Sequence, residues 1–159
     1  MFGLVACVPE HNWREASPAQ GGFVVMMPGK PDSMSREIDL NGLKIKMHMI
    51  GSKIEPVSYT VAWVHTESAA QAQKAVEAMR LGMLKNLGLA DQAGRPVQVR
   101  LKPIAGQERG GEPVKTAGLA LEVQGPAQKM QARFVAYGKR ALQVVVVGKT
   151  LDAEAAAQF

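Results

Sequence analysis

The sequence has little of several features that mark common protein classes. It contains one cysteine, Cys7, so the chain has no second thiol with which to form a disulfide. Aromatic residues make up 5% of the chain, which disfavours a surface that stacks nucleic-acid bases. No apolar run approaches the roughly 18 residues that cross a bilayer, so no membrane-spanning helix is expected. The 159 residues, 47% of them hydrophobic, suit a single domain with its own core.

The charge of the chain is moderately basic and evenly spread. The formal net charge is +5, but lysine and arginine are scattered, without a basic tail or a basic stripe interleaved with aromatics. We therefore expect no nucleic-acid partner. A mildly basic body suits a position close to anionic lipid head groups.

The single cysteine follows an apolar run and a small residue in the stretch Leu4-Val5-Ala6-Cys7. This stretch resembles the lipobox of bacterial lipoproteins, in which the cysteine is lipidated and becomes the first residue of the mature protein. An export signal also needs a positive start and an apolar segment of about 7 to 15 residues, which residues 1–6 do not supply. The resemblance therefore implies a true start upstream of Met1 and a membrane anchor at Cys7. If Met1 is the true start, we expect a cytoplasmic protein.

The chain divides into a short leading segment and one domain. Residues 11–20 are polar and loop-like, as a tether would be. We predict a residual signal, lipobox and tether over residues 1–20 and a single α/β domain over residues 21–159. Within the domain, residues 22–27 predict a first short strand that ends at Pro28-Gly29.

A β-hairpin is predicted around Asn41-Gly42, the dipeptide preferred in two-residue type I′ turns. Residues 35–40 and 43–49 alternate on either side of it. This register places apolar pairs on one face and opposite charges on the other: Leu40 with Leu43, Ile38 with Ile45, Asp39 with Lys44, and Glu37 with Lys46. Lys44 and Lys46 are therefore interpreted as members of a solvated ion-pair ladder.

One long helix is predicted over residues 68–87, after a strand at 57–64. Ser68 and Gln71 form a capping-box pattern, and Gly88 follows the final turn as a stop signal. Apolar side chains recur at helical spacing along one face, namely Ala72, Val76, Met79, Met83 and Leu87.

Four further strands are predicted at residues 97–104, 115–123, 129–137 and 141–148. Valines occupy positions 144–147 without alternation, which indicates that both faces of this strand are buried. The helix at 68–87 can cover one face, and a short helix at 152–159, opening with Asp152, can cover the other. We therefore expect an α+β fold, a three-layer α/β/α sandwich around a mainly antiparallel twisted sheet.

Several motifs together resemble small bacterial envelope proteins of the PsbP/DcrB type. They are Trp13-Arg14-Glu15, the segment Gly22-Phe23-Val24-Val25-Met26-Met27-Pro28-Gly29-Lys30-Pro31, a strand with Tyr59 and Trp63, the loop Gly106-Gln107-Glu108, and the strands from Arg133-Phe134 to Val147. The resemblance implies the same α/β/α sandwich and a role in binding or assembly. It brings no catalytic residues with it.

Residues able to bind metal or perform catalysis do not form a recognisable set. His11, His48 and His65 are widely spaced, and Met47 and Met49 should point away from His48 in a strand, so no metal site is predicted. No nucleophile motif or phosphate-binding loop is present, so neither an enzyme nor a cofactor is predicted.

The sequence leads to one main functional hypothesis, a non-catalytic, lipid-anchored lipoprotein on the periplasmic face of a membrane in the cell envelope. It would bind or help assemble a protein or lipid partner. Two alternatives stay open: a cytosolic chaperone or interaction module of the same fold, and a hydrolase whose site is assembled from loops. Partner binding is expected at the loops 28–33, 51–56 and 106–113.

Overall fold

The computed structural model describes residues 11–101 and 114–159. These residues form nine strands and two helices in the following order along the chain: β1 (Arg14–Ala16), β2 (Val25–Met27), β3 (Asp32–Leu40), β4 (Leu43–Ile54), β5 (Val57–His65), α1 (Ala69–Asn86), β6 (Arg95–Leu101), β7 (Val114–Gln124), β8 (Lys129–Tyr137), β9 (Arg140–Gly148) and α2 (Ala153–Gln158).

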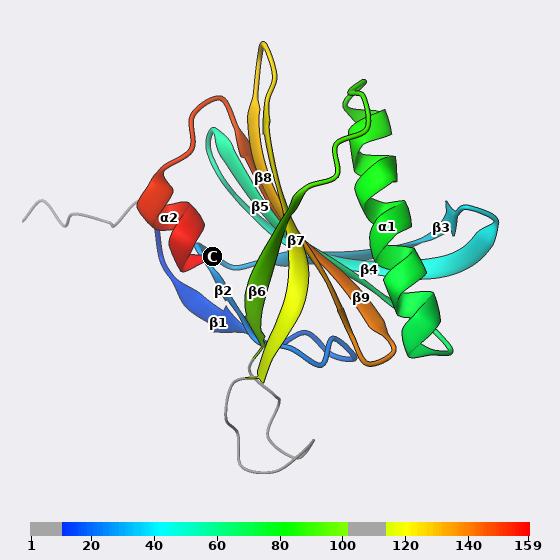
Figure 1. Ribbon diagram of the computed structural model, residues 1–159. Coiled ribbons are helices and arrows are strands. Elements are labelled where there is room, and N and C mark those ends of the chain that lie inside the picture. The colour runs from blue at the N-terminus through cyan, green and yellow to red at the C-terminus, as the bar shows by residue number, and fades with distance from the viewer. Residues whose placement is uncertain (1–10, 102–113) are drawn as a thin grey trace, which may run out of the picture.

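Seven of the strands form one sheet in the order β3-β4-β5-β9-β8-β7-β6, and each neighbouring pair is antiparallel. The chain enters through the meander β3-β4-β5 and then crosses to the far edge through α1. It returns inward through β6, β7, β8 and β9, so that β9 pairs with β5 in the middle of the sheet (Figure 1). The predicted α+β class and mainly antiparallel sheet are confirmed.

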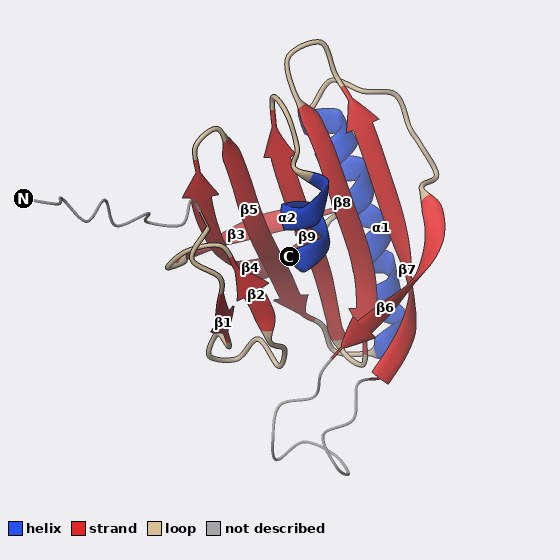
Figure 2. Cartoon of the chain, turned by 90° about the vertical axis from the view of Figure 1, so that its left-hand side faces the viewer, coloured by secondary structure: helices blue, strands red, loops and turns tan. Residues whose placement is uncertain are grey.

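The two faces of the sheet are covered by different elements (Figure 2). One face, here called the helix face, packs against α1 through a core that includes Val64, Phe134 and Val145. The other face, here called the ribbon face, carries the two-stranded β1–β2 ribbon and α2. Its core includes Trp63 and Leu142.

The predicted hairpin is confirmed in its turn and its register. Asn41 and Gly42 both have positive φ, 53° and 88°, as a type I′ turn requires. Each of the predicted cross-strand pairs is present, from Leu40 opposite Leu43 to Glu37 opposite Lys46. The Asp39 carboxylate, however, accepts a hydrogen bond from the Gly42 amide at 2.6 Å, and the structure as described contains no ion pair in this ladder.

The ends of the long helix are also confirmed. Ser68 is the N-cap, and its hydroxyl accepts a hydrogen bond from the Gln71 amide at 3.1 Å. Gly88 follows the helix with φ 67°, and the Leu89 amide donates back to the Leu84 carbonyl.

The predicted apolar face of this helix is wrong at its last position. Leu87 is the C-cap and is 42% exposed, because the chain reverses there. Leu84 takes its place in the core.

The first strand and the expected tether differ from the prediction. The predicted strand at 22–27 begins only at Val25, because Gly22, directly after a turn at residues 19–21, adopts a positive φ of 71° that a strand does not allow. Residues 14–16, expected within the polar tether, form β1, and Ala16 pairs with Val25 against the ribbon face. Trp13 packs on Tyr59. The part of residues 11–20 expected as a tether is therefore folded onto the domain.

The valine run 144–147 is buried most completely at its middle residues. Val145 is 9% exposed on the helix face and Val146 is 4% exposed on the ribbon face, whereas Val144 and Val147 are half-buried. Val147 lies on the helix face beside a groove that α1 leaves open. On the ribbon face, α2 spans six residues and covers only part of the sheet. Val144 is left at the floor of a cavity.

No helix in the two described ranges has the length and apolar composition needed to span a membrane.

Candidate functional site

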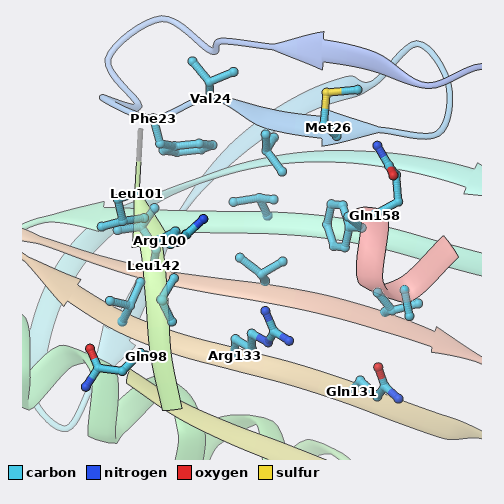
Figure 3. A pocket seen from close by; sticks show the side chains of 18 residues that line it. Phe23, Val24, Met26, Gln98, Arg100, Leu101, Gln131, Arg133, Leu142 and Gln158 are labelled. Carbon is cyan, nitrogen blue, oxygen red and sulfur yellow. The ribbon is translucent and has the colours of Figure 1, made fainter. Parts of the chain in front are cut away.

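A cavity of about 440 Å³ lies on the ribbon face of the sheet. It is bounded by the β1–β2 ribbon, by α2 and by the edge strand β6, and its floor is formed by β5, β8 and β9 (Figure 3). Small-molecule sites in proteins usually occupy about 300 to 1,000 Å³. The cavity therefore has the size of a ligand site.

The floor of the cavity is apolar because of strand alternation. Leu142, Val144 and Val146 are two residues apart on β9 and point to the same face of the sheet. Val61 on β5 stands directly opposite Val144, and Val135 on β8 stands opposite Leu142. These side chains form a continuous aliphatic surface.

Aromatic side chains held in fixed positions form two of the walls. Phe23 packs edge-on against Trp63 with ring centroids 5.1 Å apart. Phe159, which follows α2, packs edge-on against Tyr59 at 5.4 Å. Such edge-to-face packing contributes roughly 0.5 to 1.5 kcal/mol beyond burial, so both walls are stabilised by contacts outside the cavity.

The polar residues of the lining are either neutral or positively charged. They are Gln98 and Arg100 on β6, Gln131 and Arg133 on β8, and Gln158 on α2. Glutamine is neutral and arginine keeps its proton at neutral pH, so these groups offer hydrogen bonds and positive charge rather than proton transfer. The lining can hold an apolar molecule and can fix a polar or anionic end of it.

A larger groove of about 580 Å³ lies on the helix face, between α1 and the strands β3 and β4. Its apolar lining is rich in methionine, and its charged residues have both signs, namely Arg36, Asp39 and Lys85. This groove therefore shows no preference for one ligand charge. The cavity on the ribbon face has the more distinctive chemistry.

The structure does not bring the three histidines together. His48 stacks on Trp63 at 5.4 Å and contacts His65 edge-on at 6.2 Å, whereas His11 stacks on Trp13. Burial lowers the pKa of His48, and the charges of Lys46 and His65 lower it further. Within residues 11–101 and 114–159 no group of three or more potential ligands is arranged to hold a metal ion.

The methionines beside His48 lie as predicted. Met47 is 7% exposed in the core under α1, and Met49 packs against the same core. His48 lies on the opposite face of the strand, next to Trp63. Met47 and Met49 therefore act as core residues.

The loops expected to bind a partner do not line the cavity. Residues 51–54 continue strand β4 to its hairpin turn, and the loop 28–33 lies outside the lining. The loop at 106–113 and the predicted lipidation site, Cys7, lie outside the described residues. Walls formed by β2, β6 and α2 replace the expected loops, because these elements meet only when the sheet is complete.

Sequence reasoning also missed Arg133 and Arg100. The available signal was the alternation of residues 129–134, which places polar Gln131 and Arg133 on one face of an interior strand and Ala132 and Phe134 on the other. Both Gln131 and Arg133 are exposed, so this pattern by itself is also typical of a solvated strand face, and only the assembled sheet shows that the two residues border a cavity. A comparison of the chain with protein-family models, curated proteins and solved structures finds no match, so the PsbP/DcrB resemblance stays a prediction.

Proposed function

We propose that this chain is a non-catalytic binding protein of the bacterial cell envelope. It holds the apolar part of a lipid or protein partner in the cavity between the β1–β2 ribbon, α2 and β6. The observation that carries the proposal is the cavity itself, with its volume of about 440 Å³, its aliphatic floor and its aromatic walls. Apolar lining with a few polar groups is typical of ligand sites.

The chemistry of the lining supports binding rather than catalysis. Its side chains are aliphatic, aromatic, amide or guanidinium groups. A guanidinium group binds anions well but exchanges protons poorly at neutral pH. The lining therefore supplies affinity and orientation for a bound molecule.

The location rests on Cys7. We propose that Cys7 carries a lipid and holds the domain at the periplasmic face of a membrane, as the lipobox-like stretch suggests. We also propose a PsbP-like, three-layer arrangement in which α1 forms one outer layer and α2 with the β1–β2 ribbon forms the other. The position of α2 on the face opposite α1 supports this arrangement (Figure 2).

Binding can be tested with an uncharged fluorescent probe of apolar sites, N-phenyl-1-naphthylamine. Val144→Phe fills the cavity from its floor and is expected to lower probe affinity at least about tenfold. Val147→Phe makes the same change on the same strand but on the helix face, and should leave the affinity within about twofold. If Val147→Phe loses probe binding and Val144→Phe does not, the probe binds on the helix face and the proposed site is refuted.

The anchor can be tested by labelling cells with radioactive palmitate. The chain, expressed behind an export signal placed ahead of Leu4, should incorporate label, and its Cys7→Ser variant should not. An unlabelled protein with Cys7 intact contradicts the anchor, whatever the result of the probe experiment.

A further inference from the structure

We propose that the ligand of the ribbon-face cavity is a long-chain fatty acid, with its alkyl chain on the valine floor and its carboxylate at Arg133 and Arg100. The inference rests on the proposed binding function of the cavity and names the class of molecule that it takes. Its basis is the charge, the geometry and the volume of the lining.

Arg133 is an exposed cation on β8 whose cross-strand neighbours are apolar. Its cross-strand partners are Val144 on β9 and Ala120 on β7. The acidic residue on this face of β7, Glu122, stands opposite Gln131 instead. In the described parts of the chain, no carboxylate lies within 4.0 Å of the Arg133 guanidinium.

Arg100 lies at the rim of the cavity on the edge strand β6, where it is exposed and alternates with Val99 and Leu101, which pack against the ribbon-face core. Figure 3 shows Arg100 and Arg133 on the lining of the same cavity, one from each of two strands that are not hydrogen-bonded to each other. Arg100 likewise forms no ion pair with any described residue. Among the described residues, the lining contains two arginines and no acidic side chain.

The complement of this lining is an anion attached to an apolar chain. A carboxylate matches the planar fork of a guanidinium and accepts two parallel hydrogen bonds from it. Beside an apolar floor such a pair is less screened than in water, which favours a carboxylate over a neutral head group. A cationic amphiphile would be repelled by both arginines.

The volume of the cavity accommodates one alkyl chain. A water molecule takes up about 30 Å³ and a methylene group takes up a similar volume, so a cavity of about 440 Å³ holds a chain of roughly 15 methylenes. The cavity is partly open to solvent, so a phospholipid is kept as an outcome of the test.

The test is displacement of N-phenyl-1-naphthylamine from the intact protein by three amphiphiles with the same chain length: palmitate, hexadecanol and hexadecyltrimethylammonium. Palmitate is expected to displace the probe at a concentration at least about tenfold lower than hexadecanol, and the cation is expected to be weakest. Raising the salt concentration should lower the affinity of the protein for palmitate but not its affinity for hexadecanol.

Variants of the arginines separate charge from cavity shape. Arg133→Gln is expected to lower the affinity for palmitate about tenfold, and the double variant that also carries Arg100→Gln is expected to lower it further. The affinities for the probe and for hexadecanol should stay within about twofold of those of the unchanged protein. Lys129→Gln is the matched control, because it removes a positive charge from the same strand outside the cavity. It should leave all affinities unchanged.

The outcomes distinguish this inference from the proposed function. If the probe binds in the cavity but palmitate and hexadecanol displace it equally, the fatty-acid proposal is overturned and the binding function stands. The fatty-acid proposal is also overturned if Lys129→Gln weakens palmitate as much as Arg133→Gln does. If Arg133-dependent binding is seen only with phosphatidylglycerol vesicles and not with palmitate, a phospholipid replaces the fatty acid. If the probe itself does not bind, the proposed function fails first.

Discussion

Arg80 is a charged side chain at a buried position of α1, with 4% of its surface exposed. Its guanidinium donates to both carboxylate oxygens of Glu77 and to Asp91, and also to the Gln92 carbonyl. The hydrogen bond to Glu77 is the main cause that raises the pKa of Arg80, and the same bond lowers the pKa of Glu77. Arg80 thus joins the helix to the segment that follows it.

Replacement of Arg80 by methionine should lower the free energy of unfolding by about 1 to 3 kcal/mol, because the Gln92 carbonyl loses its donor and the ion pair with Asp91 is broken. Urea denaturation measures the change. Lys74→Met is the matched control on the same helix, where the lysine is exposed, and should change stability by less than about 0.5 kcal/mol. Equal effects of the two substitutions would contradict the proposed role of Arg80.

The lowered pKa of His48 predicts that stability depends on pH near neutrality. It lies between Ser35 on β3 and Trp63 on β5, with Lys46 and His65 as the nearby positive or titratable groups that lower its pKa. A lowered pKa means that the unfolded chain binds the proton more readily than the folded chain does. Stability is therefore lost as pH falls through the ordinary histidine pKa of 6.5 toward the lower value of the folded state.

We expect the urea midpoint of the protein to fall between about pH 7.5 and about pH 5.5, and to fall less in His48→Gln. This interval lies above the pKa range of the carboxylates, so the loss that Glu77 causes at more acidic pH does not contribute. An identical pH dependence in the protein and the variant would show that His48 is not responsible.

At the scale of single elements, Gly42 and Gly82 have different backbone conformations, and only that of Gly42 favours glycine over alanine. Gly42 has φ 88° in the hairpin turn, whereas Gly82 lies in the regular backbone of α1. Apart from its chain neighbours and, for Gly82, the backbone of its own helix, a Cβ atom at either position meets no atom within 4 Å. Any effect of alanine at these positions therefore comes from the backbone and not from a clash.

Gly42→Ala should destabilise the protein by about 1 to 2 kcal/mol, the cost of a left-handed conformation for a residue with a side chain. Gly82→Ala should stabilise it by up to about 1 kcal/mol, because alanine favours the helix more than glycine does. Denaturant unfolding of the two variants provides the comparison. Changes of the same sign would contradict the assigned backbone conformations.

The strands of the sheet also differ in how many neighbouring strands they are hydrogen-bonded to. The strands β5 and β9 are hydrogen-bonded on both sides, whereas β3 and β6 are edge strands. Most of β3 is exposed, as its burial along the strand shows. Local opening should therefore begin at the edges of the sheet.

For the whole molecule, amide hydrogen exchange should be slowest in β5 and β9 and faster by at least about tenfold in β3. Exchange monitored by NMR checks this order. Edge amides that exchange as slowly as those of Val61 and Val144 would mean that the sheet opens only as one unit.

The sequence by itself determined the local structure of this protein. The register of the β3–β4 hairpin follows from Asn41-Gly42 and the alternation around it, and the limits of α1 follow from Ser68 and Gly88. Each of these features depends on residues that are close together in the chain, so propensity, capping and turn geometry are sufficient to predict it.

The tertiary structure alone decided the cavity and its charge. Val61 and Val144 meet across β5 and β9 although most of the chain separates them, and the walls come from β2, β6 and α2. Pairing between distant strands depends on the packing of the whole sheet, which no short sequence pattern encodes. In the sequence, Arg133 is an ordinary polar position of a strand. Only the assembled sheet, with Val144 on one side and Ala120 on the other, leaves it without a counter-charge among the described residues.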